Sequence, residues 1–249
     1  VTCRFGHLEV YSLEDRAEPT HVGRFGPQHR HFRSAAIIEH ETLVFVVGEN
    51  AVAAYDVSEP LQPRLAGRAA SPGVAWSGCT AADRLFLADR SPQCGIRVFD
   101  VSEPDAIRET AFVPTTRAPY HIFAATADRL VVSLGADSVF HGGRAVSGNV
   151  AVLDISDPDA PTLIEERSEA GGRAATMMTV GGAPRFVCFP AVFDVGQDGL
   201  GAMHLYDVVW QREGEVMSAG STVDGAPYRG ASDGDHAALA LHTVVIVLQ

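Results

Sequence analysis

The pattern Asp-Val-Ser-Glu-Pro occurs at residues 56–60 and again at 100–104, and Asp-Ile-Ser-Asp-Pro occurs at 154–158. Weaker copies begin at residues 12 and 207, so the first position of the pattern recurs after 44, 44, 54 and 53 residues. Recurrence of this kind is typical of repeat architectures, in which each repeat is one supersecondary unit. The pattern therefore divides the chain into repeats of similar structure.

The residues between two copies of the pattern predict strands. After residues 100–104, an alternating segment covers 106–113, compact apolar segments cover 120–126 and 129–134, and 149–153 leads to the next copy. Alternating and short apolar runs bounded by turn residues are typical of strands. Four-stranded units repeated around an axis form a β-propeller, which protects its sheet edges by closing into a ring. We therefore predict an all-β fold, a β-propeller with four-stranded blades.

The two ends of the chain provide complementary parts of one unit. The N-terminal residues supply the back half of a repeat, and the C-terminal residues supply the front half. We expect a single domain of five blades, in a ring closed by C-terminal strands that pair with N-terminal strands. The expected bounds are 236–249 with 1–26 for blade 1, 27–70 for blade 2, 71–114 for blade 3, 115–169 for blade 4 and 170–223 for blade 5.

The repeats also resemble a known family. Residues 95–113 and 148–166, which contain two copies of the pattern, are similar to LVIVD repeats. The resemblance covers nearly the whole chain and is strongest in blades 2 to 4. It is weaker in blade 1, where Ser12 replaces the aspartate, and in blade 5 after Asp207. It implies a β-propeller fold, and it implies no catalytic residues, because the family brings no agreed ones.

The composition excludes several classes of function. The chain of 249 residues has a formal net charge of −12, which argues against a general nucleic-acid binder, because such a protein needs a basic face. No apolar run is long enough for a membrane-spanning helix. All 19 basic residues are arginine, so Schiff-base chemistry on a lysine is excluded. The four cysteines form no Cys-x-x-Cys pair, which argues against a zinc ribbon.

The first residues, Val-Thr-Cys-Arg-Phe-Gly-His, lack a charged segment followed by an apolar core. We therefore expect no signal peptide in this sequence. A cytoplasmic protein is the prediction, and a secreted protein whose signal has been removed is the alternative.

The repeat also sorts the polar residues onto two faces of the predicted ring. The Asp-x-Ser-x-Pro turns lie on one face, where we expect structural carboxylates on a solvated acidic rim. On the opposite face, each loop that enters an inner strand carries an arginine, a residue suited to carboxylates and phosphates. The alternative is that surface loops are polar and that arginine is the only basic residue. These arginines are Arg33, Arg68, Arg117, Arg173 and Arg229.

Histidines and aromatic residues are predicted at the same end of the inner strands. Trp76, His121 and His236 align at the start of their strands. A histidine at the mouth of an axial channel can act as a general acid or base, because its ordinary pKa lies near neutrality. The alternative for each histidine alone is a hydrogen-bonded polar residue at the edge of the core. Further residues predicted to contact a substrate are Tyr120, Phe140 and His141.

Two inserted connections lie on this same face, at residues 135–148 and 191–200. Long loops on a rigid scaffold commonly bind or cover a ligand, so we expect both to act as lids, with neutral drift in length as the alternative. A metal site is a further alternative, because His31, His121 and His236 come from separate blades and three imidazoles suit zinc or iron.

The sequence therefore favours a small-molecule-binding propeller with an axial pocket. Its chemistry would be cofactor-free acid–base catalysis, such as an isomerase, lyase, cyclase or hydrolase acting on an anionic or carbonyl-bearing substrate, with His121 and His236 as catalytic residues. A non-catalytic scaffold that binds protein is the first alternative, and the metal-dependent enzyme is the second.

Overall fold

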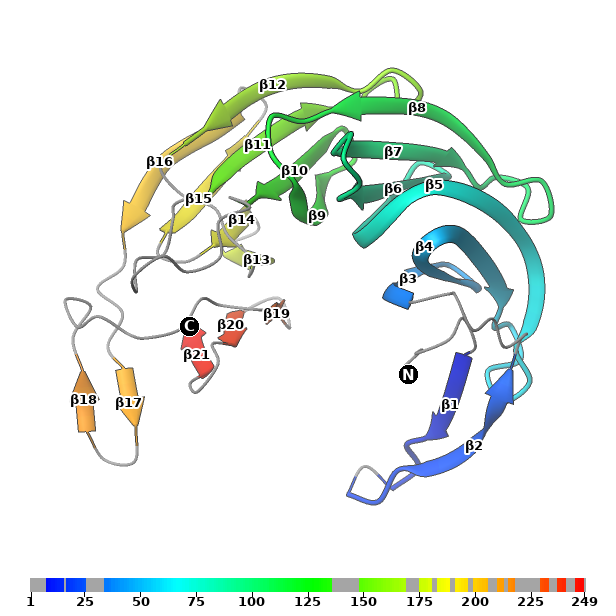
Figure 1. Ribbon diagram of the computed structural model, residues 1–249. Helices are drawn as coiled ribbons and strands as arrows, with labels where there is room; N and C mark the ends of the chain where they lie inside the picture. Colours follow the sequence, from blue (N-terminus) through cyan, green and yellow to red (C-terminus); the bar gives the residue numbers. More distant parts are fainter. Residues whose placement is uncertain are drawn as a thin grey trace. The chain divides into compact units, whose positions relative to one another are not determined.

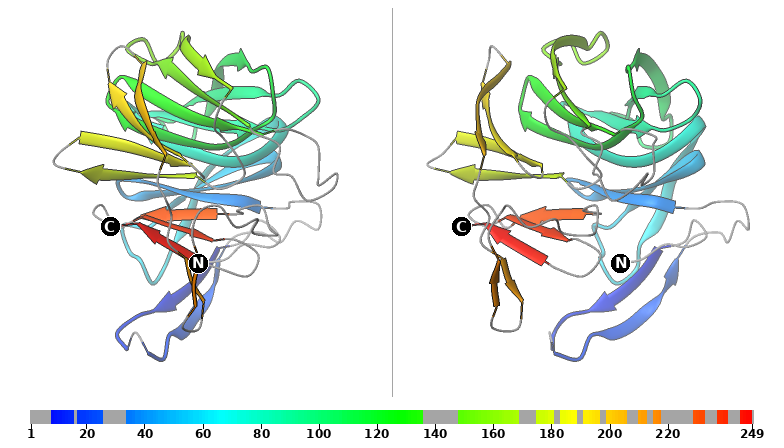
Figure 2. Two further views of the ribbon diagram at one scale, coloured as in Figure 1. Left: turned by 90° about the vertical axis from the view of Figure 1, so that its left-hand side faces the viewer. Right: turned by 60° about the vertical axis from the view of Figure 1, so that its left-hand side comes forward.

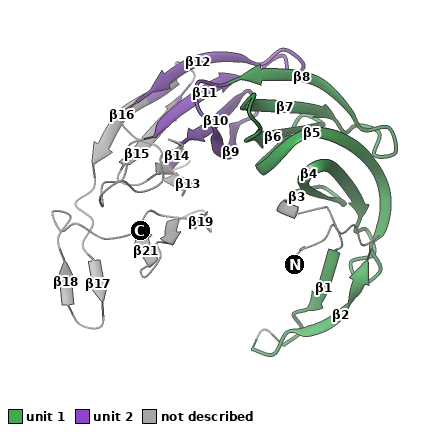
Figure 3. Ribbon diagram, in the orientation of Figure 1, with its two compact units in different colours: residues 1–114 green, residues 115–249 purple. Residues whose placement is uncertain are grey.

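A computed structural model describes the chain as strands joined by turns (Figure 1). It describes residues 8–15, 17–25, 34–135, 148–168, 175–180, 183–188, 191–196, 199–205, 210–212, 215–217, 229–232, 237–240 and 245–248. No helix occurs among these residues, which agrees with the predicted all-β fold. The chain forms two compact units, residues 1–114 and 115–249, which are described separately (Figure 3).

The first unit contains a two-stranded and a six-stranded antiparallel sheet. In the first sheet, Leu8 faces Phe25 and Ser12 faces Thr20. The six-stranded sheet has its strands in sequence order, so each strand pairs with the next along the chain. The strands of this unit are β1 (Leu8–Ser12), β2 (Thr20–Phe25), β3 (Ser34–His40), β4 (Leu43–Asp56), β5 (Arg64–Ala81), β6 (Arg84–Asp89), β7 (Gly95–Asp100) and β8 (Arg108–Pro114).

Two long strands show that the six-stranded sheet consists of two four-stranded meanders. The ends of β4 meet, because the amide of Val57 donates a hydrogen bond to the carbonyl of Thr42 at 2.8 Å. β4 therefore reverses along its length, and Asn50 has the positive φ of 63° that a tight reversal needs. β5 pairs with β4 as far as Val74 and with β6 from Ala75 onward, so it belongs to both meanders.

The described residues of the second unit form two four-stranded sheets and two smaller ones. Figure 2 shows the strands of each sheet from two further directions. The sheets are β9 (Pro119–Thr126), β10 (Arg129–Leu134), β11 (Asn149–Asp154) and β12 (Thr162–Arg167); β13 (Ala175–Val180), β14 (Ala183–Cys188), β15 (Ala191–Gly196) and β16 (Gly199–Leu205); β17 (Trp210–Arg212) and β18 (Glu215–Met217); and β19 (Arg229–Ser232), β20 (Ala237–Ala240) and β21 (Val245–Leu248).

One of the two predicted lids is wrong. Residues 191–200 were expected to form a loop, but Ala191–Gly196 is β15 and Leu200 lies in β16. Ala191 pairs with Leu205 and Val192 with His204, so the segment supplies ladder hydrogen bonds to its own sheet. Val192, Phe193 and Val195 have the β-branched and aromatic side chains that favour a strand. Of the other predicted lid, residues 136–147 lie outside the described part of the chain.

Each unit has an apolar core built from the alternating strands. In the first unit Phe45, Val52, Leu85 and Phe99 are fully buried in one cluster. In the second unit Val131, Val152 and Phe186 are fully buried in another. Burial of a large apolar side chain contributes about 1.5–3 kcal/mol to the free energy of unfolding. The apolar runs that precede the repeated turns therefore supply part of each core, through Val52 and Phe99 in the first unit and Val152 in the second.

The repeated turn has the same hydrogen bonds in all three strong copies. The amide of Ser58 donates to Oδ1 of Asp56 at 2.8 Å, that of Ser102 to Asp100 at 3.1 Å, and that of Ser156 to Asp154 at 2.8 Å. The serine of each turn lowers the pKa of its aspartate below the ordinary value, mainly through its hydroxyl at Asp100 and Asp154 and through its amide at Asp56. The carboxylates therefore stabilise the turns, as predicted.

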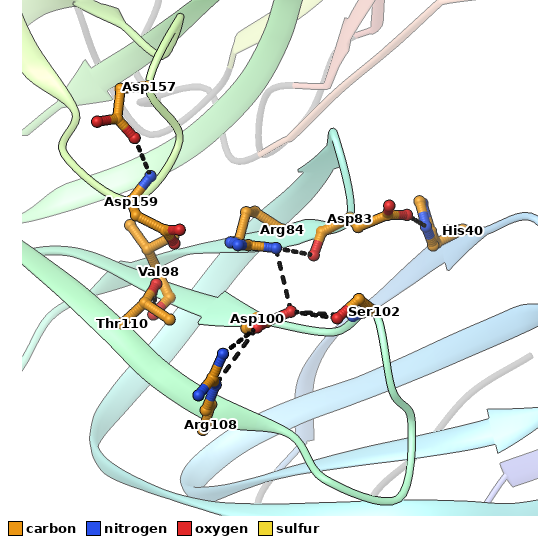
Figure 4. Close-up of polar contacts among 10 residues, drawn as sticks. All are labelled: His40, Asp83, Arg84, Val98, Asp100, Ser102, Arg108, Thr110, Asp157 and Asp159. Atoms are coloured by element: carbon orange, nitrogen blue, oxygen red, sulfur yellow. Dashed lines mark hydrogen bonds and ion pairs between the residues drawn. The ribbon is translucent and has the colours of Figure 1, made fainter.

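The expectation of a solvated rim is wrong for Asp100, which is only 8% exposed. Arg84 donates to its Oδ1 at 3.0 Å, and Arg108 donates to its Oδ2 at 2.8 Å (Figure 4). The side-chain hydroxyl of Ser102 and the guanidinium of Arg108 are the main causes of its lowered pKa. Asp100 is therefore enclosed by two cations from the neighbouring strands.

Candidate functional site

Most of the predicted site residues lie outside the described part of the chain. Among those that the structure describes, Arg68 and Arg117 have exposed side chains. Arg68 was expected in a loop that enters an inner strand, and that expectation is wrong, because Arg68 lies within β5 and pairs with Ala53 of β4. Arg229 begins β19, but its side chain is outside the described set. The predicted site residues that the structure does not describe are His31, Arg33, Phe140, His141, Arg173 and His236.

Tyr120 lies in the interior of its sheet. It is 1% exposed, and a Cβ built on Gly135 would lie 2.0 Å from its ring. The absence of a side chain at Gly135 therefore makes room for Tyr120. The buried ring of Tyr120 therefore contributes to the stability of the protein.

His121 follows Tyr120 on β9 and is partly buried. Its ring stacks on Phe123, with centroids 6.2 Å apart and planes at 21°. Phe123 in turn lies 6.0 Å from the ring of Phe186. The histidine therefore belongs to a row of aromatic rings in the second unit. Among the residues that the structure describes, no group of three or more His, Cys, Asp or Glu side chains could hold a metal ion.

Trp76 is a predicted site residue with an exposed side chain on a described strand. Its segment of β5 alternates: Ser71, Gly73 and Ala75 are buried, while Val74 is 36% and Trp76 41% exposed. Pro72, Val74 and Trp76 are all exposed, although the register of β5 shifts against both β4 and β6 in this stretch. This part of β5, where the strand passes from β4 to β6, therefore has three exposed side chains: a proline, a valine and a tryptophan.

Arg90 covers part of Trp76. Its guanidinium carbon lies 4.8 Å from the centre of the tryptophan ring, within the range of a cation–π contact. The backbone amide of Arg90 also donates to the carbonyl of Val74 at 2.9 Å. We use the name Trp76 surface for Pro72, Val74, Trp76 and Arg90. Backbone and side-chain contacts both hold it in place.

A buried carboxylate lies directly behind the Trp76 surface. Asp89 is 0% exposed and accepts hydrogen bonds from the amides of Val74 at 2.9 Å and Ser91 at 2.8 Å. It also accepts one from Nε of Arg97 at 2.6 Å. Burial raises the pKa of Asp89, but the hydrogen bonds from Ser91, Val74 and Arg97 outweigh it, so its pKa is lowered. Asp89 is therefore a buried anion that accepts hydrogen bonds from Val74, Ser91 and Arg97.

Arg97 connects Asp89 to the outer strand of the meander. Its Nη1 donates to Oε1 of Glu109 at 2.8 Å, and its guanidinium lies 4.8 Å from the ring centre of Phe112. Arg97 is only 8% exposed although it carries a charge. Two carboxylates and an aromatic face together surround the cation, which offsets the loss of hydration.

The sequence identified Trp76 but missed Asp89, Arg90 and Arg97. A signal was present, because Arg97 interrupts an otherwise apolar run in 95–99, where the matching positions of the other strong copies are Ala53 and Ala151. A charged residue in the middle of a buried strand needs a partner of opposite charge. That argument predicts a buried ion pair, although it does not identify Asp89.

Comparison with known proteins shows the fold alone. No protein-family model matches the chain, and no curated protein matches it. The N-terminal domain of Nup159 matches with a TM-score of 0.57 and 10% identity, over 100% of this chain and 72% of that one. A chain of the mitotic checkpoint complex matches with a TM-score of 0.69 and 10% identity, over 99% and 71%.

A third solved structure, Sqt1 of Saccharomyces cerevisiae, matches with a TM-score of 0.58 and 12% identity, over 87% of this chain and 58% of that one. These neighbours are β-propeller proteins. The fold is of the β-propeller type. The two four-stranded meanders of the first unit and the four-stranded sheets of the second agree with it. No helix of the described residues is long and apolar enough to cross a membrane.

Proposed function

We propose that the chain is a non-catalytic β-propeller module that binds an extended segment of a protein partner through the Trp76 surface. The observation that carries the proposal is the state of Trp76, which is 41% exposed yet held under the guanidinium of Arg90. A large apolar side chain that a protein fixes at its surface is available for a partner to bury.

The residue types of this surface are those that dominate protein interfaces. Tryptophan and arginine are enriched among interface residues whose truncation costs most, and aromatic residues are enriched at interface centres. Trp76 and Arg90 lie beside each other, and Val74 and Pro72 extend the apolar area along the same strand. Because the backbone of Val74 is bonded on both its amide and carbonyl sides, little conformational entropy is lost when a partner binds.

The comparisons support this proposal rather than the small-molecule enzyme that the sequence favoured. One structural neighbour is part of the mitotic checkpoint complex, an assembly of several proteins. The low identities restrict this likeness to the fold, so the support is that the same architecture serves a protein complex in that case.

Selection of peptides from a random display library tests the proposal. Binders are selected on the wild-type chain and counter-selected on the Trp76→Ala variant. We expect peptides that bind the wild type and not the variant, because the indole supplies the anchor. A matched control is Leu163→Ala, since Leu163 is also an exposed apolar residue, 54% exposed, on a strand of the other unit. The proposal is wrong if the selected peptides bind Trp76→Ala as well as they bind the wild type.

The small-molecule site at His121 and His236 is the second candidate. His121 favours it to the extent that a partly buried histidine stacked on Phe123 is held in one orientation. In this proposal Arg117, Arg173 and Arg229 would orient an anionic ligand and no cofactor is needed, whereas zinc or iron at His31, His121 and His236 would be the metal-dependent form. Metal analysis of purified protein separates the two: stoichiometric metal that is lost in His121→Ala would establish the metal-dependent form.

We also propose a five-bladed ring of the LVIVD-repeat type, closed by the chain ends. In the aligned repeats, Val10 occupies the position of Val152 and Ile246 that of Val131, and Val131 faces Val152 across β10 and β11. Closure therefore predicts that Val10 faces Ile246. The test is oxidative cross-linking of the Val10→Cys, Ile246→Cys double variant. Closure predicts a disulfide between the two positions, and a chain that shows none while remaining folded would contradict it.

A further inference from the structure

We infer that Asp89, Arg97 and Glu109 form a network whose role is to position the Trp76 surface. That this positioning supports partner binding rests on the proposed function. That the network positions Val74 and Trp76 rests on the contacts alone. The three residues come from β6, β7 and β8, the three strands that follow β5 in the sheet. They connect the interior of one meander to the exposed residues Val74 and Trp76 of β5.

The network reaches the Trp76 surface through a direct contact. Oδ1 of Asp89 accepts the amide hydrogen of Val74, two residues before Trp76. The neighbouring Gly73 lies so close that a Cβ there would be 2.1 Å from the carboxylate. The path of β5 between Gly73 and Trp76 therefore follows the carboxylate of Asp89, and any displacement of that side chain displaces the strand.

The other end of the network fixes Asp89. Arg97 donates to Asp89 at 2.6 Å and to Glu109 at 2.8 Å, and it lies over the ring of Phe112. Gly95 leaves the space for that ring, because a Cβ on Gly95 would lie 2.5 Å from it. The guanidinium thus has contacts on two edges and one face. Together with Ser91, whose amide and hydroxyl also donate to Asp89, it holds the carboxylate where it accepts the amide of Val74.

The neighbouring repeat shows that a blade does not need this network. Strand pairing places Leu134 at the position of Asp89, Ala151 at that of Arg97 and Leu163 at that of Glu109. The β9–β12 sheet thus forms with apolar residues at all three positions. Replacement of a buried ion pair by well-packed apolar residues is often neutral or stabilising, so stability alone does not account for the ion pair here. The reason we infer is the orientation of Val74, Trp76 and Arg90.

An exchange of residues between the two repeats tests the inference. The variant Asp89→Leu, Arg97→Ala, Glu109→Leu carries the side chains of the β9–β12 sheet. It is made in a Trp210→Phe background, because the chain has two tryptophans and Trp76 then reports alone. Two quantities are measured: quenching of Trp76 fluorescence by acrylamide, and affinity for a peptide selected on the wild type. Circular dichroism and the thermal midpoint report whether the variant is folded.

We expect the exchanged variant to fold, its Trp76 to become more accessible to acrylamide, and its affinity to fall by at least about tenfold. A second variant, Asp89→Asn, keeps an acceptor for the amide of Val74 and loses the charge that binds Arg97, so it should give an intermediate quenching rate. If the triple variant does not fold, the quenching rate of Asp89→Asn alone tests the inference.

Arg108→Ala is the matched control, because it removes an ion pair of the same meander at 2.8 Å from Asp100, on the side of the repeated turns. It should lower stability without changing the quenching of Trp76. Unchanged quenching in both Asp89 variants would overturn the inference. If quenching changes but no peptide binds the wild type, the positioning network stands and the proposed function fails.

Discussion

The guanidinium carbon of Arg90 lies 4.8 Å from the centre of the Trp76 ring, and its backbone amide is bonded to Val74 on the same strand as that ring. Arg90 therefore contacts the exposed indole with its side chain and is bonded through its backbone to β5, the strand that carries Trp76. An exposed aromatic side chain with such support is prepared for contact with a partner.

Removal of the arginine side chain should loosen the tryptophan. In Arg90→Ala the indole loses a cation–π contact worth about 0.5–2 kcal/mol, so its fluorescence should become more easily quenched and peptide binding should weaken several-fold. The measurement is quenching and titration of the single-tryptophan protein. Arg68→Ala, an exposed arginine earlier on β5, is the control and should leave the quenching unchanged.

Two of the repeated aspartates, Asp100 and Asp56, should contribute differently to the free energy of unfolding. Asp100 accepts hydrogen bonds from Ser102, Arg84 and Arg108. Asp100→Ala should therefore lower the free energy of unfolding by about 2–4 kcal/mol, because two arginines lose their buried partner. Asp56→Ala should cost less, since Asp56 is more exposed and lacks an arginine at the position of Arg84, where the chain has Leu43. Denaturant titration of both variants measures the order, and equal losses would contradict it.

Acid should destabilise the protein through the same carboxylates. The pKa values of Asp56, Asp89, Asp100 and Asp154 are lowered in the folded state. A lowered pKa means that the unfolded chain takes up protons first as pH falls. The stabilisation is thus complete above the ordinary aspartate pKa, about 3.9, and is lost as pH falls through the folded-state values. The free energy of unfolding should decrease steadily below about pH 4, and less steeply in Asp100→Ala.

Two glycines should be intolerant of a methyl group. A Cβ on Gly67 would lie 1.8 Å from the carbonyl oxygen of Pro104, and one on Gly135 would lie 2.0 Å from the ring of Tyr120. Backbone or a buried ring must then move, so Gly67→Ala and Gly135→Ala should each lower stability by about 1–3 kcal/mol or more. Gly23→Ala is the comparison, because its Cβ would be 3.2 Å from the flexible side chain of Phe25. Thermal midpoints of the three variants give the result.

The sequence predicted the strands because its repeat is local. The Asp-x-Ser-x-Pro turn and the apolar run before it are read from neighbouring residues, and β7, β11 and the second half of β4 lie where that rule places them. The same rule failed at residues 191–200. The repeat predicts a connection there, but the backbone of residues 191–196 pairs with β14 and β16 instead.

The candidate site was predictable only in part, because its contacts join residues that are distant along the chain. Trp76 was singled out by its place at the start of an inner strand. Its partner Arg90 and the carboxylate of Asp89 follow it by 14 and 13 residues, and their roles depend on how β5 bends between two partner strands. Tyr120 was expected in a pocket, but its fully buried position depends on the space that Gly135 leaves for it, 15 residues later.

The affinity of a wild-type-selected peptide for three proteins tests the central claim most directly. Titration calorimetry compares the wild type, Trp76→Ala and Leu163→Ala, each shown to be folded by circular dichroism. The account predicts that Trp76→Ala weakens binding by about 30-fold or more, the loss of a residue at the centre of an interface, and that Leu163→Ala changes it by less than about threefold. Equal affinities for wild type and Trp76→Ala would contradict the proposal that this surface holds the partner.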